Sequence, residues 1–246
     1  MDYKSQRQWI RGDLWQQWGS LELDQRRGVP LPLLQNPYPP ASTVIDLVSP
    51  NEISVGNMSV LEAIRMRLSC RAYSPVPLTI EELSFLLWAT QGVKSIIMDG
   101  YATQRTVPSG GSRHPFETYL AVQRVASLAP GMYRYLAIEH KLLLLNEDHA
   151  IGQKISEGCA DFAMDSAVTF IWTAIPYRTE WRYGPLSSKL IAQDSGHVCQ
   201  NLYLACTAIH AGTCAVGAYN QPMMDSLLGV DGVDEFTIYC AAVGKC

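Results

Sequence analysis

Arginine and serine alternate over residues 67–71, as Arg67, Ser69 and Arg71. Two guanidinium groups and one hydroxyl at this spacing can surround a phosphate, because they supply charge-assisted and bidentate hydrogen bonds. The alternative is a solvated basic end of a helix, where cations suit the helix dipole. Short basic clusters are common, so these three residues taken alone favour the alternative.

A second stretch that could bind a ligand is the turn-rich loop that contains Pro108, Ser109, Gly110 and Gly111. Two successive glycines expose backbone N–H groups, which can line the edge of a polar ring or bind an anion. The alternative is a tight turn before a strand, since these are also ordinary turn residues. The sequence leaves both interpretations open.

A third stretch is Cys214 to Tyr219, in which Val216 and Gly217 follow a short apolar run. A glycine at this place would allow main-chain N–H groups to reach a ring nitrogen with no side chain in the way. The stretch would then form the floor of a site for a flat ligand. The alternative is simply the turn that follows a core helix.

One long helix must position these stretches. Residues from Ser187 to about His210 are good helix formers without proline, and from Val198 onward they are apolar on nearly every face. Such a helix belongs in the middle of a core. Gly212 is a natural stop after it, and residues 213–216 read as a short buried strand. Asp194 and His197 lie one turn apart on this helix and are expected to form a structural polar pair.

The remaining elements alternate irregularly between helices and strands. Capping boxes at Ser59 and Thr79 predict two helices, and the second ends near Gln91. Further elements are short helices at 148–159 and 222–228, strands at 116–125, 168–175 and 235–243, a hairpin around Glu139-His140, and irregular segments at 93–106 and 176–188. This order predicts an α+β fold and not a doubly wound one.

We expect two parts in the chain, residues 1–57 and residues 58–246. The first contains a predicted helix from Gln6 to Trp18, with three tryptophans near one face, and a proline-rich arm at 28–50 without regular structure. The tryptophan helix is expected to dock on the body or on a second subunit.

Composition excludes several functions. The chain has 246 residues and a net charge of −4, and it lacks a basic patch, so nucleic acid is not an expected partner. Charged residues make up only 17%, which suggests that a partner subunit covers much surface. No secretory signal and no membrane span are expected. The seven cysteines are interpreted as reduced thiols of a cytoplasmic protein, with neither a disulfide nor a metal site.

The order of these motifs resembles the nitroreductase-like flavoprotein family, and more closely its SagB/ThcOx branch, FMN-dependent dehydrogenases that oxidise azoline rings to azoles. The resemblance rests on R-x-S-x-R, LLWATQGV, VPSGG, D-S-G-H-V-x-Q-N-L-Y-L-A and G-T-C-A-V-G-A-Y, and covers roughly residues 60–244. It implies a nitroreductase-type fold, a central mostly antiparallel sheet covered by helices. It also implies a homodimer with FMN at the interface.

The resemblance further implies roles for the three stretches. Arg67, Ser69 and Arg71 would hold the FMN phosphate. The loop from Pro108 to Gly111, which includes Ser109 and Gly110, would approach the isoalloxazine from the partner chain. Val216 and Gly217 would place a backbone N–H near the flavin N5, which accepts hydride.

Two positions depart from the branch. Azoline oxidases carry a Lys-Tyr pair before the central helix, and the matching pair is Arg182-Tyr183. Arginine stays protonated and cannot act as a base, although Tyr183 could act as an acid. Many relatives also bring a further basic residue to the phosphate from beyond the last strand, for which Lys245 is the candidate.

Three functions therefore compete at this point. The first is a SagB-type dehydrogenase acting on an azoline or a similar small ring. The second is a general NAD(P)H-dependent nitroreductase or quinone reductase. The third is a non-catalytic flavin-fold subunit that binds a partner through its proline arm and tryptophan helix.

Overall fold

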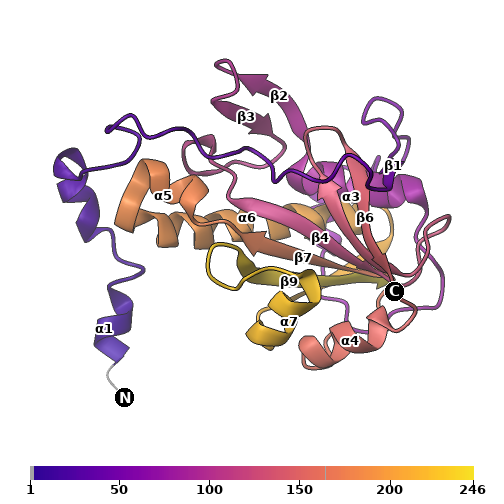
Figure 1. The fold of residues 1–246 in the computed structure, drawn as a ribbon. Helices are drawn as coiled ribbons and strands as arrows, with labels where there is room; N and C mark the ends of the chain where they lie inside the picture. Colours follow the sequence, from indigo (N-terminus) through magenta and orange to yellow (C-terminus); the bar gives the residue numbers. More distant parts are fainter. Residues whose placement is uncertain (1–2, 164) are drawn as a thin grey trace.

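A computed structural model describes residues 3–163 and 165–246 (Figure 1). Its helices are α1 (Tyr3–Arg7), α2 (Val60–Met66), α3 (Ile80–Gln91), α4 (Ile151–Gly158), α5 (Tyr177–Tyr183), α6 (Ser187–Ala208) and α7 (Gln221–Leu228), with 3-10 turns η1 (Asp13–Ser20), η2 (Gly110–Ser112) and η3 (Gly184–Leu186). Its strands are β1 (Val44–Asp46), β2 (Val93–Ile97), β3 (Ala102–Arg105), β4 (Phe116–Val122), β5 (Gly131–Leu136), β6 (Lys141–Glu147), β7 (Val168–Ala174), β8 (Ala211–Val216) and β9 (Phe236–Lys245).

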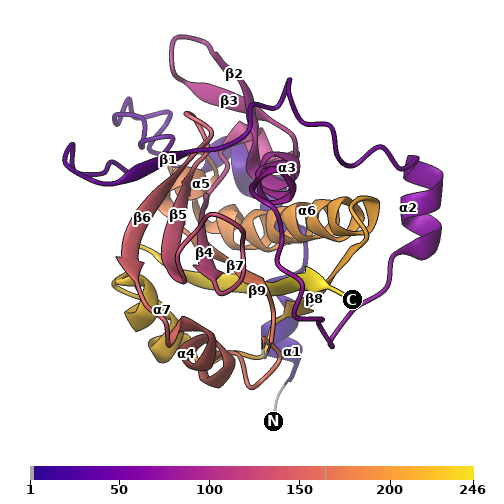
Figure 2. The same cartoon turned by 90° about the vertical axis from the view of Figure 1, so that its right-hand side faces the viewer.

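Seven strands form one sheet in the order β1-β6-β5-β4-β7-β9-β8, and all six of its strand pairs are antiparallel. The figures show α3 and α6 over one face and α4 and α7 over the other (Figure 2). The predicted α+β class, with a mostly antiparallel sheet covered by helices, is confirmed. The predicted homodimer stays a prediction.

The central strands β4 and β7 are buried on both faces of the sheet, because alternate side chains enter the core on one face or the core on the other. In β7, Phe170 and Trp172 pack with α3 and α6, whereas Ile171 packs with α4 and α7. All seven residues of β7 are buried. This explains why its sequence is continuously apolar and does not alternate with polar residues.

Helix α6 crosses one face of the sheet, as its length and composition predict. Val198, Leu202 and Cys206 are buried against the sheet and α3. The capping box that begins α3 is confirmed, since Thr79 accepts from the Glu82 N–H and the Glu82 side chain accepts from the Thr79 N–H. Within the described ranges, no helix has the length and apolar character needed to cross a lipid bilayer.

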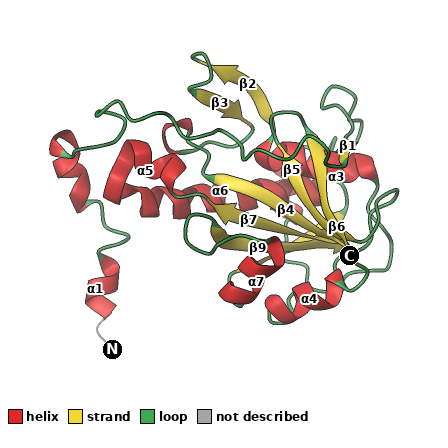
Figure 3. Ribbon diagram, viewed as in Figure 1, coloured by secondary structure: helices red, strands yellow, loops and turns green. Residues whose placement is uncertain are grey.

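Two segments expected to be irregular are regular (Figure 3). Residues 93–106 contain the hairpin of β2 and β3, whose turn includes Asp99-Gly100. That dipeptide is a strong hairpin signal, so the sequence held the information. Residues 177–183 form α5, which begins after Pro176 and ends at Gly184, where φ is +51°.

The proline-rich arm is part of the sheet, contrary to the expectation that it lacks regular structure. Its β1 pairs with β6, where β-branched Val44 and Ile45 lie opposite leucines. Upstream of β1, Asn36 donates its backbone N–H to Glu117 at 2.8 Å, and Glu117 also pairs with buried Arg178 at 2.5 Å. The arm is therefore fixed by buried charged groups. The division of the chain at residue 57 stays a prediction.

The expected single helix from Gln6 to Trp18 is wrong. Residues 3–7 form α1, and a separate 3-10 turn, η1, follows after Gly12. Glycine inside a helix costs about 1 kcal/mol relative to alanine, which helps to explain the break. Neither element contains a buried residue, and Figure 1 shows α1 standing away from the body.

The expectation that all cysteines are reduced is also wrong. Cys70 and Cys246 form a disulfide across a sequence separation of 176 residues. The other five cysteines are free and buried. A pairing at this sequence separation depends on the tertiary fold and cannot be deduced from cysteine spacing alone.

Candidate functional site

Ser69 lies beside the edge strand β8. It forms a parallel bridge with Thr213, and the next residue, Cys70, donates its N–H to the Thr213 carbonyl at 3.0 Å. The Ser69 hydroxyl shares a hydrogen bond of 3.1 Å with the Tyr203 hydroxyl, which also accepts from the Ala215 N–H at 2.9 Å. One tyrosine of α6 thus connects the R-x-S-x-R motif to the strand that ends at Val216.

The two arginines of the motif keep their guanidinium groups available. Arg67 lies over the ring of Tyr203, 5.4 Å from its centroid, and is half-buried. Arg71 is exposed. Among residues 3–163 and 165–246, neither arginine forms an ion pair with a carboxylate. Positive charge that no carboxylate neutralises suits an anionic ligand at this edge.

The end of β8 is open. Val216 is buried at 2% exposure, whereas Gly217 is exposed, and a Cβ built on Gly217 would meet nothing within 4 Å. Within the part of the chain that the structure describes, no atom therefore fills the space next to the Cβ position of Gly217. A flat ligand could approach the backbone here, as the sequence suggested.

The loop that contains Ser109 and Gly110 is held by Asp194 of α6. The Ser109 hydroxyl donates to Asp194 Oδ2 at 2.6 Å, and the Gly110 N–H donates to the same oxygen at 3.2 Å. The Ser109 oxygen in turn accepts from the His114 N–H at 2.9 Å. The side chain of Asp194 is only 5% exposed, so this carboxylate is a buried acceptor dedicated to the loop.

The sequence predicts only His197 as a partner of Asp194. That contact exists, but the Asp194 Oδ1 to His197 Nδ1 distance is 3.7 Å and the His197 side chain is half exposed. Burial raises the pKa of Asp194, while the Ser109 and Gly110 donors oppose that rise. The loop is thus the main partner, and its position 84 residues earlier in the chain gave no sequence signal.

Gly111 brings the same loop against the Arg182-Tyr183 pair. Its φ is +59°, and a Cβ built on it would lie 2.5 Å from the Tyr183 hydroxyl and 3.1 Å from Arg182 Cδ. Only glycine suits this backbone conformation and this close approach. The loop and residues 182–183 therefore pack closely within one chain, whereas the approach of the loop to a flavin from the partner chain stays a prediction.

Aromatic side chains surround the Arg182-Tyr183 pair. Tyr183 is buried, and the ring of Trp15 lies edge-on to it at 6.0 Å between centroids. Arg182 Nη1 donates to the Tyr101 hydroxyl at 3.2 Å, but its buried Nε has no partner among the described residues. An unpaired buried donor is unusual in a folded protein and marks this place as one that a ligand could complete.

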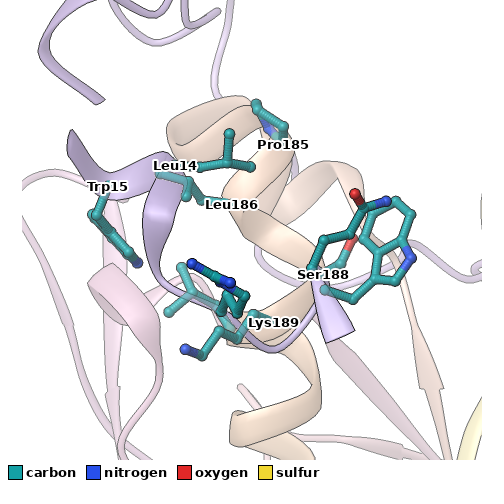
Figure 4. Close-up of a pocket in the computed structure, with 10 residues that line it drawn as sticks. Leu14, Trp15, Pro185, Leu186, Ser188 and Lys189 are labelled. Carbon is teal, nitrogen blue, oxygen red and sulfur yellow. The ribbon is translucent and has the colours of Figure 1, made fainter. Parts of the chain in front are cut away.

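A small pocket lies next to this pair, between η1 and the start of α6 (Figure 4). Leu14 and Trp15 form one wall, and Pro185, Leu186 and Lys189 form the other. Trp15 of η1 therefore contacts the body beside residues 182–183, although it is 42% exposed, and the docking role expected for the tryptophans stays a prediction.

Lys245 lies elsewhere. Its ammonium contacts Glu82 Oε1 at 2.5 Å and donates to the Ile209 carbonyl at 2.9 Å. The strand pairing places it opposite Ala211, at the far end of β8 from Val216. Its predicted role at a phosphate stays a prediction, although its charge is already engaged by a carboxylate.

The structure thus gathers the predicted residues into two groups along α6. Arg67 and Ser69 lie beside Tyr203, and the Ser109 loop lies beside Asp194. These two anchors are nine positions apart on the helix, which corresponds to about 14 Å at 1.5 Å per residue. Within the described part of the chain, no cluster of metal-binding side chains occurs.

Comparisons with known proteins agree with this architecture. A protein of Methanocaldococcus jannaschii described as a nitroreductase is 30% identical over 181 residues, 73% of this chain and 87% of its own length. The trifolitoxin-processing protein TfxB of Rhizobium leguminosarum bv. trifolii is 26% identical over 65% of this chain, but the match spans only 46% of TfxB.

Solved structures show the same fold. A structure described as a nitroreductase of Ralstonia eutropha JMP134 superposes with a TM-score of 0.69 at 25% identity, covering 88% of this chain and 98% of its own. A chain of the E. coli microcin synthetase McbBCD complex with truncated pro-MccB17 bound gives 0.64 at 16% identity, covering 86% and 78%. The sequence model of the Nitroreductase family matches residues 64–245, and the chain belongs to that family.

Proposed function

We propose that this member of the nitroreductase family is an FMN-dependent oxidoreductase of the SagB type, which oxidises an azoline or a similar small ring. The observation that carries the proposal is the position of Arg67, Ser69 and Arg71 beside β8, with no carboxylate paired to either guanidinium within the described residues. The 26% identity to TfxB, a toxin-processing protein, supports the choice of a peptide substrate.

The residues present fit FMN. Arg67, Ser69 and Arg71 would bind its phosphate, since guanidinium groups match phosphate oxygens bidentately. Gly217, with nothing within 4 Å of a Cβ built on it, leaves room for a flat ring beside the backbone of Val216 and Gly217. The N–H groups of the loop from Pro108 to Gly111 would meet the ring, although the Gly110 N–H is already bonded to Asp194.

Oxidation of an azoline to an azole removes two electrons and two protons. FMN, when bound, supplies the acceptor for the hydride that carries both electrons, and oxygen or another acceptor later receives them. The second hydrogen leaves the substrate as a proton, which water or a side chain must take. No covalent nucleophile from the protein is needed.

Arg182 and Tyr183 are the proposed catalytic residues. Arg182 would orient the substrate through its partner-free Nε, because a permanently charged group is a donor and not a base. Tyr183 would exchange a proton through its hydroxyl, which lies against Gly111. Because Tyr183 is buried beneath Trp15, access to it requires movement of η1 or entry from the side of the loop.

A homodimer is part of the proposal. Helix α2 exposes an apolar surface in which Val60, Leu61 and Ile64 are 70%, 58% and 58% exposed. An apolar patch of this kind is typical of a protein interface. The patch adjoins the R-x-S-x-R motif, so a second copy on it would also enclose the cofactor, and that copy's loop at 108–111 would reach the ring.

A second candidate is an NAD(P)H-dependent nitroreductase or quinone reductase. Arg182 favours it, because arginine stands where azoline oxidases carry a lysine that handles the proton. The M. jannaschii relative described as a nitroreductase also favours it. Both candidates use the same phosphate site and differ in the electron donor and in the acceptor that receives the electrons.

The test begins with an absorbance spectrum of the purified protein and the mass of the cofactor released from it. The proposal expects a visible flavin band and the mass of FMN. A mass matching FAD would contradict the phosphate assignment, because FAD has no terminal phosphomonoester. Absence of any flavin after reconstitution with FMN would favour a non-catalytic subunit.

The electron donor then separates the two candidates. Anaerobic bleaching of the flavin band by an azoline peptide, with release of the azole, supports the SagB-type activity. Rapid bleaching by NADPH or NADH with no reaction of the azoline supports the reductase. Wild type and Tyr183→Phe should be compared, because loss of the hydroxyl should slow proton transfer to or from the substrate without removing the flavin.

A further inference from the structure

The disulfide of this protein lies inside the motif proposed to bind phosphate. Cys70 is the residue between Ser69 and Arg71, and its partner is Cys246, directly after Lys245 at the end of β9. The Cα atoms of the two cysteines are 6.7 Å apart. One covalent bond therefore joins the R-x-S-x-R segment to the last strand of the sheet.

A glycine of β8 makes room for the disulfide. Gly212 of β8 lies beneath the disulfide, since a Cβ built on it would be 2.2 Å from Cys246 Sγ and 2.4 Å from Cys70 Cβ. Any larger residue at position 212 would displace one of the two cysteines. The bridge thus spans β8, with Cys70 bonded to Thr213 on one side and β9 paired on the other.

Few buried side chains fix this segment. Ala63 is the single buried residue of α2, and residues 64–77 contain no buried residue. The motif is tied to the body by the Cys70 N–H bond to Thr213, the Ser69–Tyr203 bond and the disulfide. Just after it, the Tyr73 hydroxyl donates to the Cys70 and Ala242 carbonyls, and the Ser74 N–H donates to the Lys245 carbonyl. A segment with so little buried surface opens locally at low free-energy cost once its covalent tie is broken.

The disulfide is also accessible. Cys246 is exposed and Cys70 is half-buried, and both border an open hollow of about 400 Å³ that includes Leu68 and His210. The five other cysteines are buried, so a thiol in solution would meet this pair first. Access is one of the factors that set the rate of thiol–disulfide exchange.

We propose that Cys70–Cys246 is a thiol–disulfide exchange site that controls how firmly the protein holds the phosphate group of its cofactor. Closed, the disulfide fixes Arg67, Ser69 and Arg71 against β8. When a dithiol reductant opens the disulfide, the segment becomes mobile. The two arginines must then be ordered again at each binding event. The effect on FMN rests on the proposed function, whereas the effect on the segment does not.

The thiol–disulfide exchange needs no electron donor other than the dithiol reductant. A thiolate of the dithiol attacks Cys246 Sγ, which forms a mixed disulfide and releases Cys70 as a thiolate that takes a proton. The second thiol of the reductant, as its thiolate, then attacks the mixed disulfide, so the reductant leaves as a cyclic disulfide and Cys246 is released as a thiol. Two electrons pass from the dithiol to the protein.

The experiment compares oxidised protein with protein reduced by dithiothreitol and freed of it by anaerobic gel filtration. Mass spectrometry after alkylation reports which cysteines are reduced. Hydrogen exchange of residues 67–71 and titration with FMN are measured on both forms. Ordering two arginine side chains costs enough that we expect roughly tenfold weaker FMN binding after reduction, together with faster exchange.

Cys246→Ser provides the matched control. It should behave as the reduced form does, with and without dithiothreitol, because it cannot form the disulfide. The residues of the R-x-S-x-R motif are unchanged in this variant. Equal exchange at residues 67–71 and equal FMN affinity in oxidised and reduced wild type would overturn the proposal. If neither form binds FMN but reduction still raises exchange at 67–71, the proposed function fails and the control of segment mobility stands.

Discussion

The two halves of α6 hold two different kinds of binding element. Near its C-terminal end, Tyr203 contacts Arg67 and Ser69, two residues that bring donors and a positive charge with no carboxylate partner among the described residues. Nine residues earlier, Asp194 holds the Ser109 loop with a carboxylate whose closest partners are the neutral donors of that loop, with His197 farther away at 3.7 Å. The first group is complete only with an anion, whereas the second is already complete.

This difference indicates what each group can offer a ligand. The Arg67 group can bind a phosphate without giving up an existing ion pair, so the electrostatic gain is not offset by a broken contact. The Ser109 group has used its hydroxyl and the Gly110 N–H internally, so it contributes mainly shape and its remaining N–H groups. Affinity should therefore depend on the first group and geometry on the second.

The largest expected effect is on the phosphate group. Replacing both arginines, Arg67→Ala with Arg71→Ala, should weaken FMN binding by about 3–6 kcal/mol, since each charge-assisted hydrogen bond contributes about 1.5–3. Fluorescence titration of apoprotein with FMN measures this loss, and riboflavin, which lacks the phosphate, should bind the variant and wild type alike. Arg65→Ala, at an exposed position of α2, is the matched control. Unchanged FMN retention in the double variant would reject the site.

The next effect concerns the loop. Asp194→Asn keeps the size of the side chain, but its amide nitrogen must face either the Ser109 hydroxyl or the Gly110 N–H, and both donate in the wild type. Leaving a buried donor unsatisfied costs about 1–3 kcal/mol. We expect a lower free energy of unfolding by that amount and faster hydrogen exchange at residues 109–111.

His197→Ala controls for the other partner of Asp194. The His197 side chain is 47% exposed and 3.7 Å from the carboxylate, so its loss should change stability little. A larger loss for His197→Ala than for Asp194→Asn would mean that the pair expected from the sequence, and not the loop, is the main function of Asp194. FMN affinity should stay close to that of wild type in both variants.

A smaller effect is expected at Tyr203. Tyr203→Phe removes the hydroxyl that joins Ser69 to the Ala215 N–H and leaves the ring under Arg67. The loss of this link should cost about 1 kcal/mol of stability and weaken FMN binding roughly fivefold. Tyr177→Phe, which removes an exposed bond to Asp24, is the control. Equal FMN affinity in Tyr203→Phe and wild type would show that Ser69 needs no support from α6.

The sequence predicted the elements better than the contacts between them. The sheet, α3 and α6 followed from apolar runs and from the capping box at Thr79, which are local signals. The hairpin turn at Asp99-Gly100 was also a local signal, within a segment expected to be irregular. The contacts of Asp194 and Cys70 had no local signal, because their partners lie 84 and 176 residues away in the chain. Such pairings are selected by tertiary packing, which no spacing in the sequence encodes.

The smallest expected effect is on the pH dependence of stability. It tests whether burial or the loop donors dominate the pKa of Asp194. Burial raises its pKa above the ordinary value of 3.8, although the Ser109 and Gly110 donors act in the opposite direction. The folded state therefore binds this proton more readily than the unfolded state. The resulting stability is fully present below pH 3.8 and is lost as the pH rises through the raised folded-state pKa.

Wild type should accordingly gain free energy of unfolding relative to Asp194→Asn as the pH falls from about 7 to about 4, measured by urea unfolding at each pH. Other groups titrate alike in both proteins, so the difference isolates residue 194. Ser109→Ala removes a donor that lowers the pKa, so its gain should be larger and begin at higher pH. If wild type instead loses stability relative to Asp194→Asn on acidification, the loop donors outweigh burial, and the loop end of α6 behaves as a charged site like the Arg67 end.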